Sequence, residues 1–174
     1  GPAAVPHESA VLHVRGAAAY TDDLPEPRGT LHAALGVSPV AHGRLRGLDL
    51  AAVRAAPGVV DVIVAADLPG VNDVGPIVHD DPILADGTLH FAGQPVFAVA
   101  ATSVDAARRA TTLVHMDIEP LPAILTIDAA LAAEAFVAAP VHVRRGDAAK
   151  ALAHAPHRAQ GEIRSGGQDH LYFE

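Results

Sequence analysis

The chain has 174 residues, of which 50% are apolar, and a formal net charge of −8, so it can build one sizeable core with room for part of a second domain. It has no cysteine, which excludes disulfides, thiolate nucleophiles, thiolate zinc sites and the usual cysteine ligands of iron–sulfur clusters from this chain. Its 12 lysines and arginines are scattered rather than clustered, which argues against a nucleic acid partner.

The chain opens with a stretch that predicts little regular structure. Residues 1–19 contain Pro2 and Pro6 and no clear period, which predicts an extended lead-in. Asp22 and Asp23 begin a loop rich in proline and glycine, so they are interpreted as turn caps rather than as a metal or acid/base pair. There is no secretory leader and no apolar run of the ~20 residues needed to span a bilayer, so we expect a cytoplasmic setting and no membrane partner.

Hydrophobic patterns then predict alternating strands and helices. Strands are predicted at 30–37, 44–48, 59–64, 95–101, 114–119 and 157–164. Helices are predicted at 50–56, 104–114, 129–134 and 148–154, capped by Asp49, Ser103, Asp128 and Asp147 in that order. Gly36 indicates a bulge or a close approach, and residues 95–101 have the continuous apolar character of a central buried strand.

Two of the predicted helices have a recognisable apolar face. In the first, Leu50 and Val53 share one face, and Pro57-Gly58 ends the helix. In the second, the shared face is expected to carry Val104, Ala107, Thr111 and Val114.

Metal and nucleophile patterns are weak along the whole chain. His79-Asp80-Asp81 lies in a long loop at 71–87 and favours solvated side chains over a metal site. His154 and His157 are separated by Pro156, which prevents both from sharing one helical face. We therefore expect no metal bound directly by side chains, and no serine here has the pattern of a nucleophile.

The last nine residues, 166–174, carry the most specific pattern. Gly166-Gly167 can form a turn or allow a close backbone approach, and Gln168 adds an amide that donates and accepts hydrogen bonds. His170 to Phe173 predict the start of a strand with no partner left in the sequence, which suggests a chain cut short of its natural end. From the residues alone, a turn before a strand is the simpler interpretation.

Three ordered stretches resemble signatures of the xanthine dehydrogenase and aldehyde oxidase family. The final stretch Gly166–Glu174 resembles the family's Gly-Gly-Gln-acidic-His signature, and Phe91–Val96 resembles its middle signature. Pro6–Ala10 and His13–Pro25 resemble the opening of the molybdopterin-binding subunit of bacterial xanthine dehydrogenases.

The resemblance implies an α+β fold. It comprises an extended lead-in at 1–13, an alpha/beta-hammerhead domain with a mixed sheet and two or three helices at 14–127, and, at 128–174, a linker with the start of a truncated molybdopterin-binding domain. It places Gln168 beside the molybdenum of the cofactor, where an amide can donate a hydrogen bond but cannot act as a base. No catalytic residue is expected in this fragment, since the family's catalytic glutamate lies further along.

The implied activity is that of a molybdenum hydroxylase that oxidises hypoxanthine and xanthine to urate in purine catabolism, using oxygen from water. Molybdopterin would be the cofactor, with 2Fe-2S clusters and FAD on a partner subunit or segment. The expected partners are the rest of the molybdopterin subunit, the iron–sulfur/FAD subunit and a purine, within a homo-oligomeric complex. The isolated chain is expected to be inactive. Two alternatives stay open: an aldehyde or other N-heterocycle oxidase, and a non-catalytic binding module.

Overall fold

The computed structural model describes residue 5 and residues 7–170. Contacts between residues divide the chain into two units, Gly1–Ile124 and Leu125–Glu174, which are described separately below. Among the described residues, no helix has the length and apolar character to cross a membrane.

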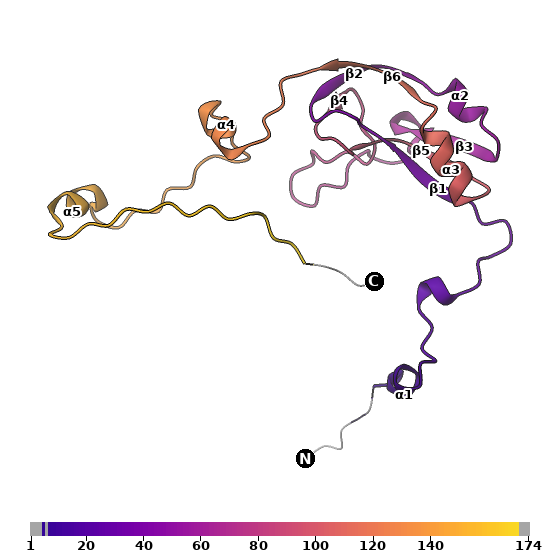
Figure 1. Ribbon diagram of the computed structural model, residues 1–174, viewed down its shortest axis with the longest axis horizontal. Coiled ribbons are helices and arrows are strands. Elements are labelled where there is room, and N and C mark those ends of the chain that lie inside the picture. Colours follow the sequence, from indigo (N-terminus) through magenta and orange to yellow (C-terminus); the bar gives the residue numbers. More distant parts are fainter. Residues whose placement is uncertain (1–4, 6, 171–174) are drawn as a thin grey trace. The chain divides into compact units, whose positions relative to one another are not determined.

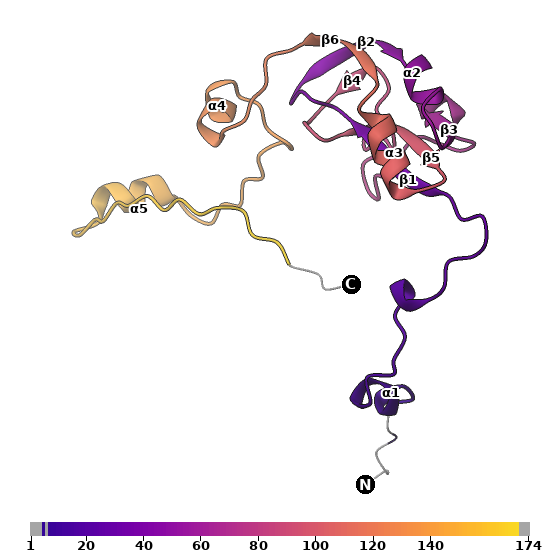
Figure 2. The same ribbon diagram turned by 45° about the vertical axis from the view of Figure 1, so that its right-hand side comes forward.

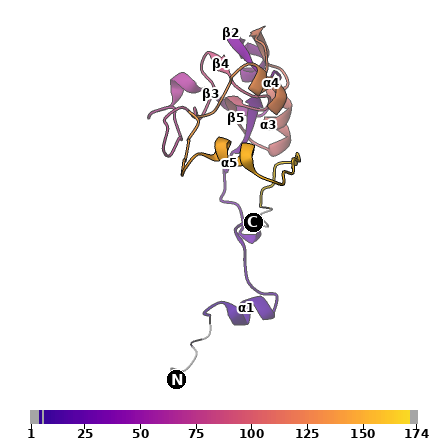
Figure 3. The same cartoon turned by 90° about the vertical axis from the view of Figure 1, so that its left-hand side faces the viewer.

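The first unit contains two small antiparallel sheets (Figure 1). One sheet has the order β1 (His32–Val37), β5 (Pro95–Ala101), β3 (Val59–Val64). The other has the order β4 (Thr88–Leu89), β2 (Gly43–Asp49), β6 (His115–Pro120), and β2 and β4 lie beside each other in Figure 3. The predicted strands of this unit are thus confirmed, and together with the helices they give the predicted α+β class. The predicted mixed sheet was wrong, because every strand pair among the described residues is antiparallel.

Strand β5 is central because its sequence is apolar on both faces. It pairs with β1 on one side and β3 on the other, and Phe97, Val99 and Ala101 are fully buried. Pro95, which has no N–H to donate, stands at the first position of the strand. The prediction of a central buried strand at 95–101 is confirmed.

Gly36 lies at both a bulge and a close approach, the two features that its position in the strand predicts. The register between β1 and β5 shifts between Gly36 and Val37, which is a bulge. A Cβ added at Gly36 would lie 2.0 Å from Cε1 of Phe97, so the phenylalanine ring occupies the space that any other side chain would need.

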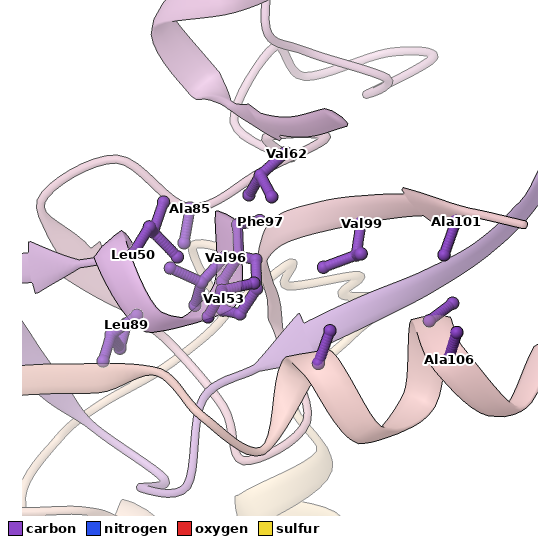
Figure 4. Close-up of a cluster of buried hydrophobic side chains, with 12 residues drawn as sticks. Leu50, Val53, Val62, Ala85, Leu89, Val96, Phe97, Val99, Ala101 and Ala106 are labelled. Carbon is purple, nitrogen blue, oxygen red and sulfur yellow. The ribbon is translucent and has the colours of Figure 1, made fainter. Parts of the chain in front are cut away.

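Helix α3 (Val104–Thr111) covers one face of the β1-β5-β3 sheet (Figures 1 and 4). Ser103 caps it as predicted, since its Oγ accepts a hydrogen bond of 3.2 Å from the N–H of Ala106. The predicted apolar face was only partly right: Ala107 is buried, and Val114, which follows the end of the helix at Thr111, packs partly buried against the core. The buried residues are Ala106, Ala107 and Ala110, because only small side chains fit between helix and sheet, and Val104 is 44% exposed.

Helix α2 (Ala51–Arg54) is shorter than the predicted 50–56. Leu50 and Val53 are buried as expected, and Pro57-Gly58 follows with Gly58 at a φ of +84°. The N-cap position is Leu50 rather than Asp49, although the Asp49 carboxylate still accepts a hydrogen bond of 2.9 Å from the N–H of Ala51.

The lead-in is not wholly extended, which corrects the prediction for residues 1–19. A helix, α1 (Ala10–Val14), forms there and ends in a Schellman motif at Gly16, with φ +66° and a 2.8 Å bond from Ala17 N–H to Leu12 C=O. The glycine after an apolar run was the overlooked signal. Two 3₁₀ turns, η1 (Thr21–Asp23) and η2 (Ala65–Asp67), complete this unit, and the Asp23 carboxylate accepts from the N–H of Tyr20 as a turn cap should.

The second unit has two short helices, α4 (Ile127–Ala132) and α5 (Ala148–His154), both labelled in Figure 2. Asp147 caps α5 as predicted, accepting 2.9 Å from the N–H of Lys150. The predicted cap of α4 was wrong: Thr126, not Asp128, accepts from the N–H of Ala129, and the helix ends at Ala132. Thr126 directly precedes the first helical residue, Ile127, and so occupies the N-cap position, whereas Asp128 lies inside the first turn.

The strand predicted at 157–164 does not form in the described part of the chain. An isolated extended segment gains no ladder hydrogen bonds, and the described residues of this unit include no strand for it to pair with. The strand predicted from His170 to Phe173 lies largely outside the described residues.

Candidate functional site

Gln168 lies in an extended, exposed segment of the second unit. Within the described residues its amide makes no hydrogen bond, and the nearest ordered contact is the 2.7 Å bond from the N–H of His170 to the carboxylate of Asp169.

The two glycines before it do not form the turn that the residues alone favoured. Neither has a positive φ, and a Cβ added at either position would meet nothing within 4 Å. The adjacent glycines thus make neither a close approach nor a turn among the described residues.

The chemistry of Gln168 suits a hydrogen bond to a cofactor but not direct coordination of a metal. A single neutral amide can donate to and accept from a bound group, but it lacks the thiolates, imidazoles or carboxylates that would coordinate a metal directly. Gln168 thus fits a supporting hydrogen bond to a cofactor held by other residues, and its predicted place beside molybdenum stays a prediction.

Acidic and histidine residues do not gather into a metal site in the described part of the chain, where no cluster of three or more such side chains has ligand geometry. Polar side chains of the long loop at 71–87 instead hold its two ends together. The amide of Asn72 bonds to both the C=O and the N–H of Leu84, at 2.7 Å and 3.0 Å, so the two ends of the loop are tied together.

Asp73 organises the inside of this loop. Its carboxylate accepts from the N–H of Gly75 at 2.8 Å and of Asp81 at 3.3 Å, and it lies 2.7 Å from Nδ1 of the exposed His79. The hydrogen bond from Gly75 is the largest cause that lowers the pKa of Asp73, and His79 adds to it. These contacts form a structural clasp inside the loop.

Gln94 is one of two buried polar residues in the described part of the chain, the other being Ser38, and its sequence pattern did not predict this role. It is 2% exposed, and its Oε1 accepts a hydrogen bond of 2.7 Å from the N–H of His90. Its own C=O accepts from the N–H of Ser38 at 2.8 Å, which ties the turn before β5 to the turn after β1. The signal was a glutamine between glycine and proline directly before a buried strand, where an amide can satisfy main-chain groups.

A groove of about 540 Å³ lies between β2, α2, η2 and residues 85–87. Its two arginines are already paired, Arg46 with Glu119 and Arg54 with Asp61 at 3.7 Å. Asp86 is the acidic residue of its lining, and no buried side-chain N or O atom among the described residues lacks a hydrogen-bond partner.

Known proteins are similar to this chain in both sequence and fold. The family model for "aldehyde oxidase and xanthine dehydrogenase, a/b hammerhead domain" matches residues 15–122. A xanthine dehydrogenase of Oryza sativa is 38% identical over 175 residues, and a nicotinate hydroxylase of Emericella nidulans is 38% identical over 177 residues; each alignment covers 98% of this chain and 13% of the relative.

A solved structure gives the same result. The aldehyde oxidoreductase of Desulfovibrio desulfuricans superposes with a TM-score of 0.68 at 31% identity, covering 76% of this chain and 16% of that one. The antiparallel sheets, the short helices and the matched residues agree, so this chain belongs to the aldehyde oxidase and xanthine dehydrogenase family and contains its α/β-hammerhead domain.

Proposed function

We propose that this chain is the amino-terminal part of the molybdopterin-binding subunit of a xanthine dehydrogenase-type molybdenum hydroxylase. The observation that carries the proposal is the hammerhead match over residues 15–122, together with relatives that align over nearly the whole chain. Because the chain spans 13% of the rice relative, the activity would belong to the complete enzyme and not to this segment.

In this proposal the domains keep the predicted bounds: a lead-in at 1–13, the hammerhead domain at 14–127, and a linker with the start of the cofactor domain at 128–174. When bound, molybdopterin supplies the two-electron oxidation that hydroxylates a ring carbon with oxygen from water. Gln168 would contribute one hydrogen bond to that group and fix its orientation. The 2Fe-2S clusters, the FAD, the homo-oligomeric complex and the cytoplasmic setting remain predictions of the same proposal.

Hypoxanthine and xanthine are the proposed substrates. The xanthine dehydrogenase of rice supports a purine, but the nicotinate hydroxylase is equally similar, at 38% identity. A nitrogen heterocycle other than a purine is therefore the second candidate. A non-catalytic module is the weaker alternative, because the family match supports an enzyme subunit.

The inactivity of the isolated chain has a direct test. The purified 174-residue chain should give no xanthine-dependent reduction of a dye acceptor, whereas the full-length protein should reduce the dye and contain molybdenum. Turnover by the isolated chain would contradict this part of the proposal. A full-length protein without molybdenum would contradict the proposal as a whole.

The role of Gln168 can be separated from general effects by a matched pair of variants. Gln168→Ala in the full-length protein should lower xanthine turnover and alter the absorption spectrum of the bound cofactor. Gln160→Ala removes an exposed glutamine from the same unit and should change neither. Equal behaviour of the two variants would show that Gln168 has no place beside the cofactor.

A further inference from the structure

Strand β2 has one fully paired edge and one half-paired edge. On the first side, β6 pairs with it along its whole length, Gly43–Asp49. On the second side, β4 pairs with its first two residues, and the C=O of Gly87 accepts one further hydrogen bond of 2.7 Å from the N–H of Leu45. Within the part of the chain that the structure describes, no strand pairs with residues 46–49 on this second side. We call residues 46–49 the open edge.

The groove of about 540 Å³ runs along the open edge. It is lined by four consecutive residues of β2, 45–48. Side chains alternate between the two faces of a strand, so a groove on one face would meet every second residue, whereas a groove along the edge meets them in succession. A bulge adds Arg46 to the strand, which accounts for two neighbouring residues in the lining but not for four. The groove therefore lies against the main chain of β2.

The open edge exists because the segment before β4 turns to the other sheet. The N–H of Ala85 donates a 2.7 Å hydrogen bond to the C=O of Pro95 in β5, so residues 85–87 cross between the sheets instead of following β2. Gly47 lies in the open edge, and the nearest atom to a Cβ added there would be Cβ of Asp117, at 3.5 Å. With no side chain in the way, another backbone can approach β2 closely at this point.

Asp86 gives the groove an unbalanced negative charge. The two arginines of the lining each have a carboxylate partner, Glu119 for Arg46 and Asp61 for Arg54. The exposed carboxylate of Asp86, by contrast, makes neither an ion pair nor a hydrogen bond with any of the residues that the structure describes. The other lining residues are aliphatic or glycine, so a complementary ligand carries a positive charge opposite Asp86 and apolar side chains elsewhere.

We propose that the open edge binds an extended segment of a second protein chain, which adds to the sheet as a short strand and places a lysine or arginine beside Asp86. An unpaired edge offers a row of main-chain N–H and C=O groups, and an extended peptide satisfies such a row at once. The half-exposed ion pairs of Arg46 and Arg54 give the groove a charged rim, which suits a contact between separate chains that forms and dissociates. The site lies within the first unit and does not depend on the proposed enzymatic activity.

Backbone pairing can be tested with peptide probes on the full-length protein. The parent probe is a fluorescent peptide of alternating valine and threonine with a lysine near each end, so that either strand direction brings a lysine to Asp86. Two further probes carry N-methyl groups on one or the other alternate set of residues, because successive N–H groups of a strand point to opposite sides. Fluorescence anisotropy should show that one methylated probe binds like the parent and the other about tenfold more weakly. Equal affinities of the two methylated probes, or no binding of the parent probe, would overturn the proposal.

The place of binding and the charge pairing have their own measurements. The parent probe should slow hydrogen exchange of the segment 46–49 several-fold, and unchanged exchange there would rule out the open edge as the site. A probe with glutamate in place of lysine should bind several-fold more weakly to the wild-type protein. Asp86→Asn should remove this preference, whereas Asp80→Asn, which changes an exposed aspartate outside the groove, should keep it. A preference for lysine that survives Asp86→Asn would contradict the proposed pairing.

Discussion

Helices in both units of this chain are capped by side chains, but only in the first unit does a helix bury residues against a sheet. In the first unit, α3 is capped by Ser103 and buries three alanines against a sheet. In the second, α5 is capped by Asp147 and buries none of its residues. The comparison shows that a correct cap and a good helical sequence define an element, whereas burial of apolar surface supplies most of the free energy that keeps it folded.

The strongest way to sharpen this comparison is to remove one phenylalanine from each unit. Phe97→Ala empties a fully buried position and should lower the free energy of unfolding by about 3–5 kcal/mol. Phe136→Ala removes a side chain that is 56% exposed in the second unit and should have little effect. Urea unfolding of the 174-residue chain, followed by far-ultraviolet circular dichroism, measures both, and similar losses would break the distinction.

Gln94 tests whether the polar contacts of the first unit matter as much as its apolar ones. Gln94→Ala removes a buried amide and leaves the part-buried N–H of His90 without its acceptor, which should cost about 1–3 kcal/mol in the same unfolding experiment. Gln160→Ala, in the second unit, is the control and should be neutral. A neutral Gln94→Ala would show that water replaces the amide.

The helix caps allow the most direct comparison of like with like. Ser103→Ala should lower the global free energy of unfolding by about 1 kcal/mol, because α3 unfolds together with the core. Asp147→Ala should reduce only the helix signal of α5 and leave the main transition unchanged. A shift of the main transition by Asp147→Ala would mean that the second unit unfolds cooperatively with a core.

The smallest expected effect is confined to the loop at 72–84. The folded-state pKa of Asp73 is lowered, so its contribution is present above its unfolded value of about 4 and is lost as the pH falls through the folded value. The amide of Gly75 should therefore exchange with solvent faster relative to a free peptide as acid is added, and Asp73→Asn should remove this pH dependence. An unchanged Gly75 protection factor down to pH 2 would contradict the clasp.

Much of the first unit follows from local pattern. The β-branched run at Val59–Val64 and the apolar run at Pro95–Ala101 were placed correctly, because strands buried between neighbours need that composition. Spacing alone could not show that only alanines fit beneath α3, which depends on the distance between helix and sheet.

The second unit was predicted less well for a physical reason. A run such as His157–Arg164 has strand propensity, but a strand needs a partner, and propensity does not reveal whether one is present. The polar residues of the two units likewise differ in how far the sequence could predict them. The sequence singled out Gln168 by resemblance, while the buried role of Gln94 emerged only when the turns after β1 and before β5 were seen to meet.

Hydrogen exchange of the 174-residue chain tests the contrast between the two units most directly. The amides of Val96 to Ala101 in β5 should be the slowest to exchange, because they open only when the core unfolds. Those of α5, at Ala148–His154, should exchange close to the rate of an unstructured peptide. Comparable protection of the two elements would contradict the account, because it would require a second core among residues 125–174.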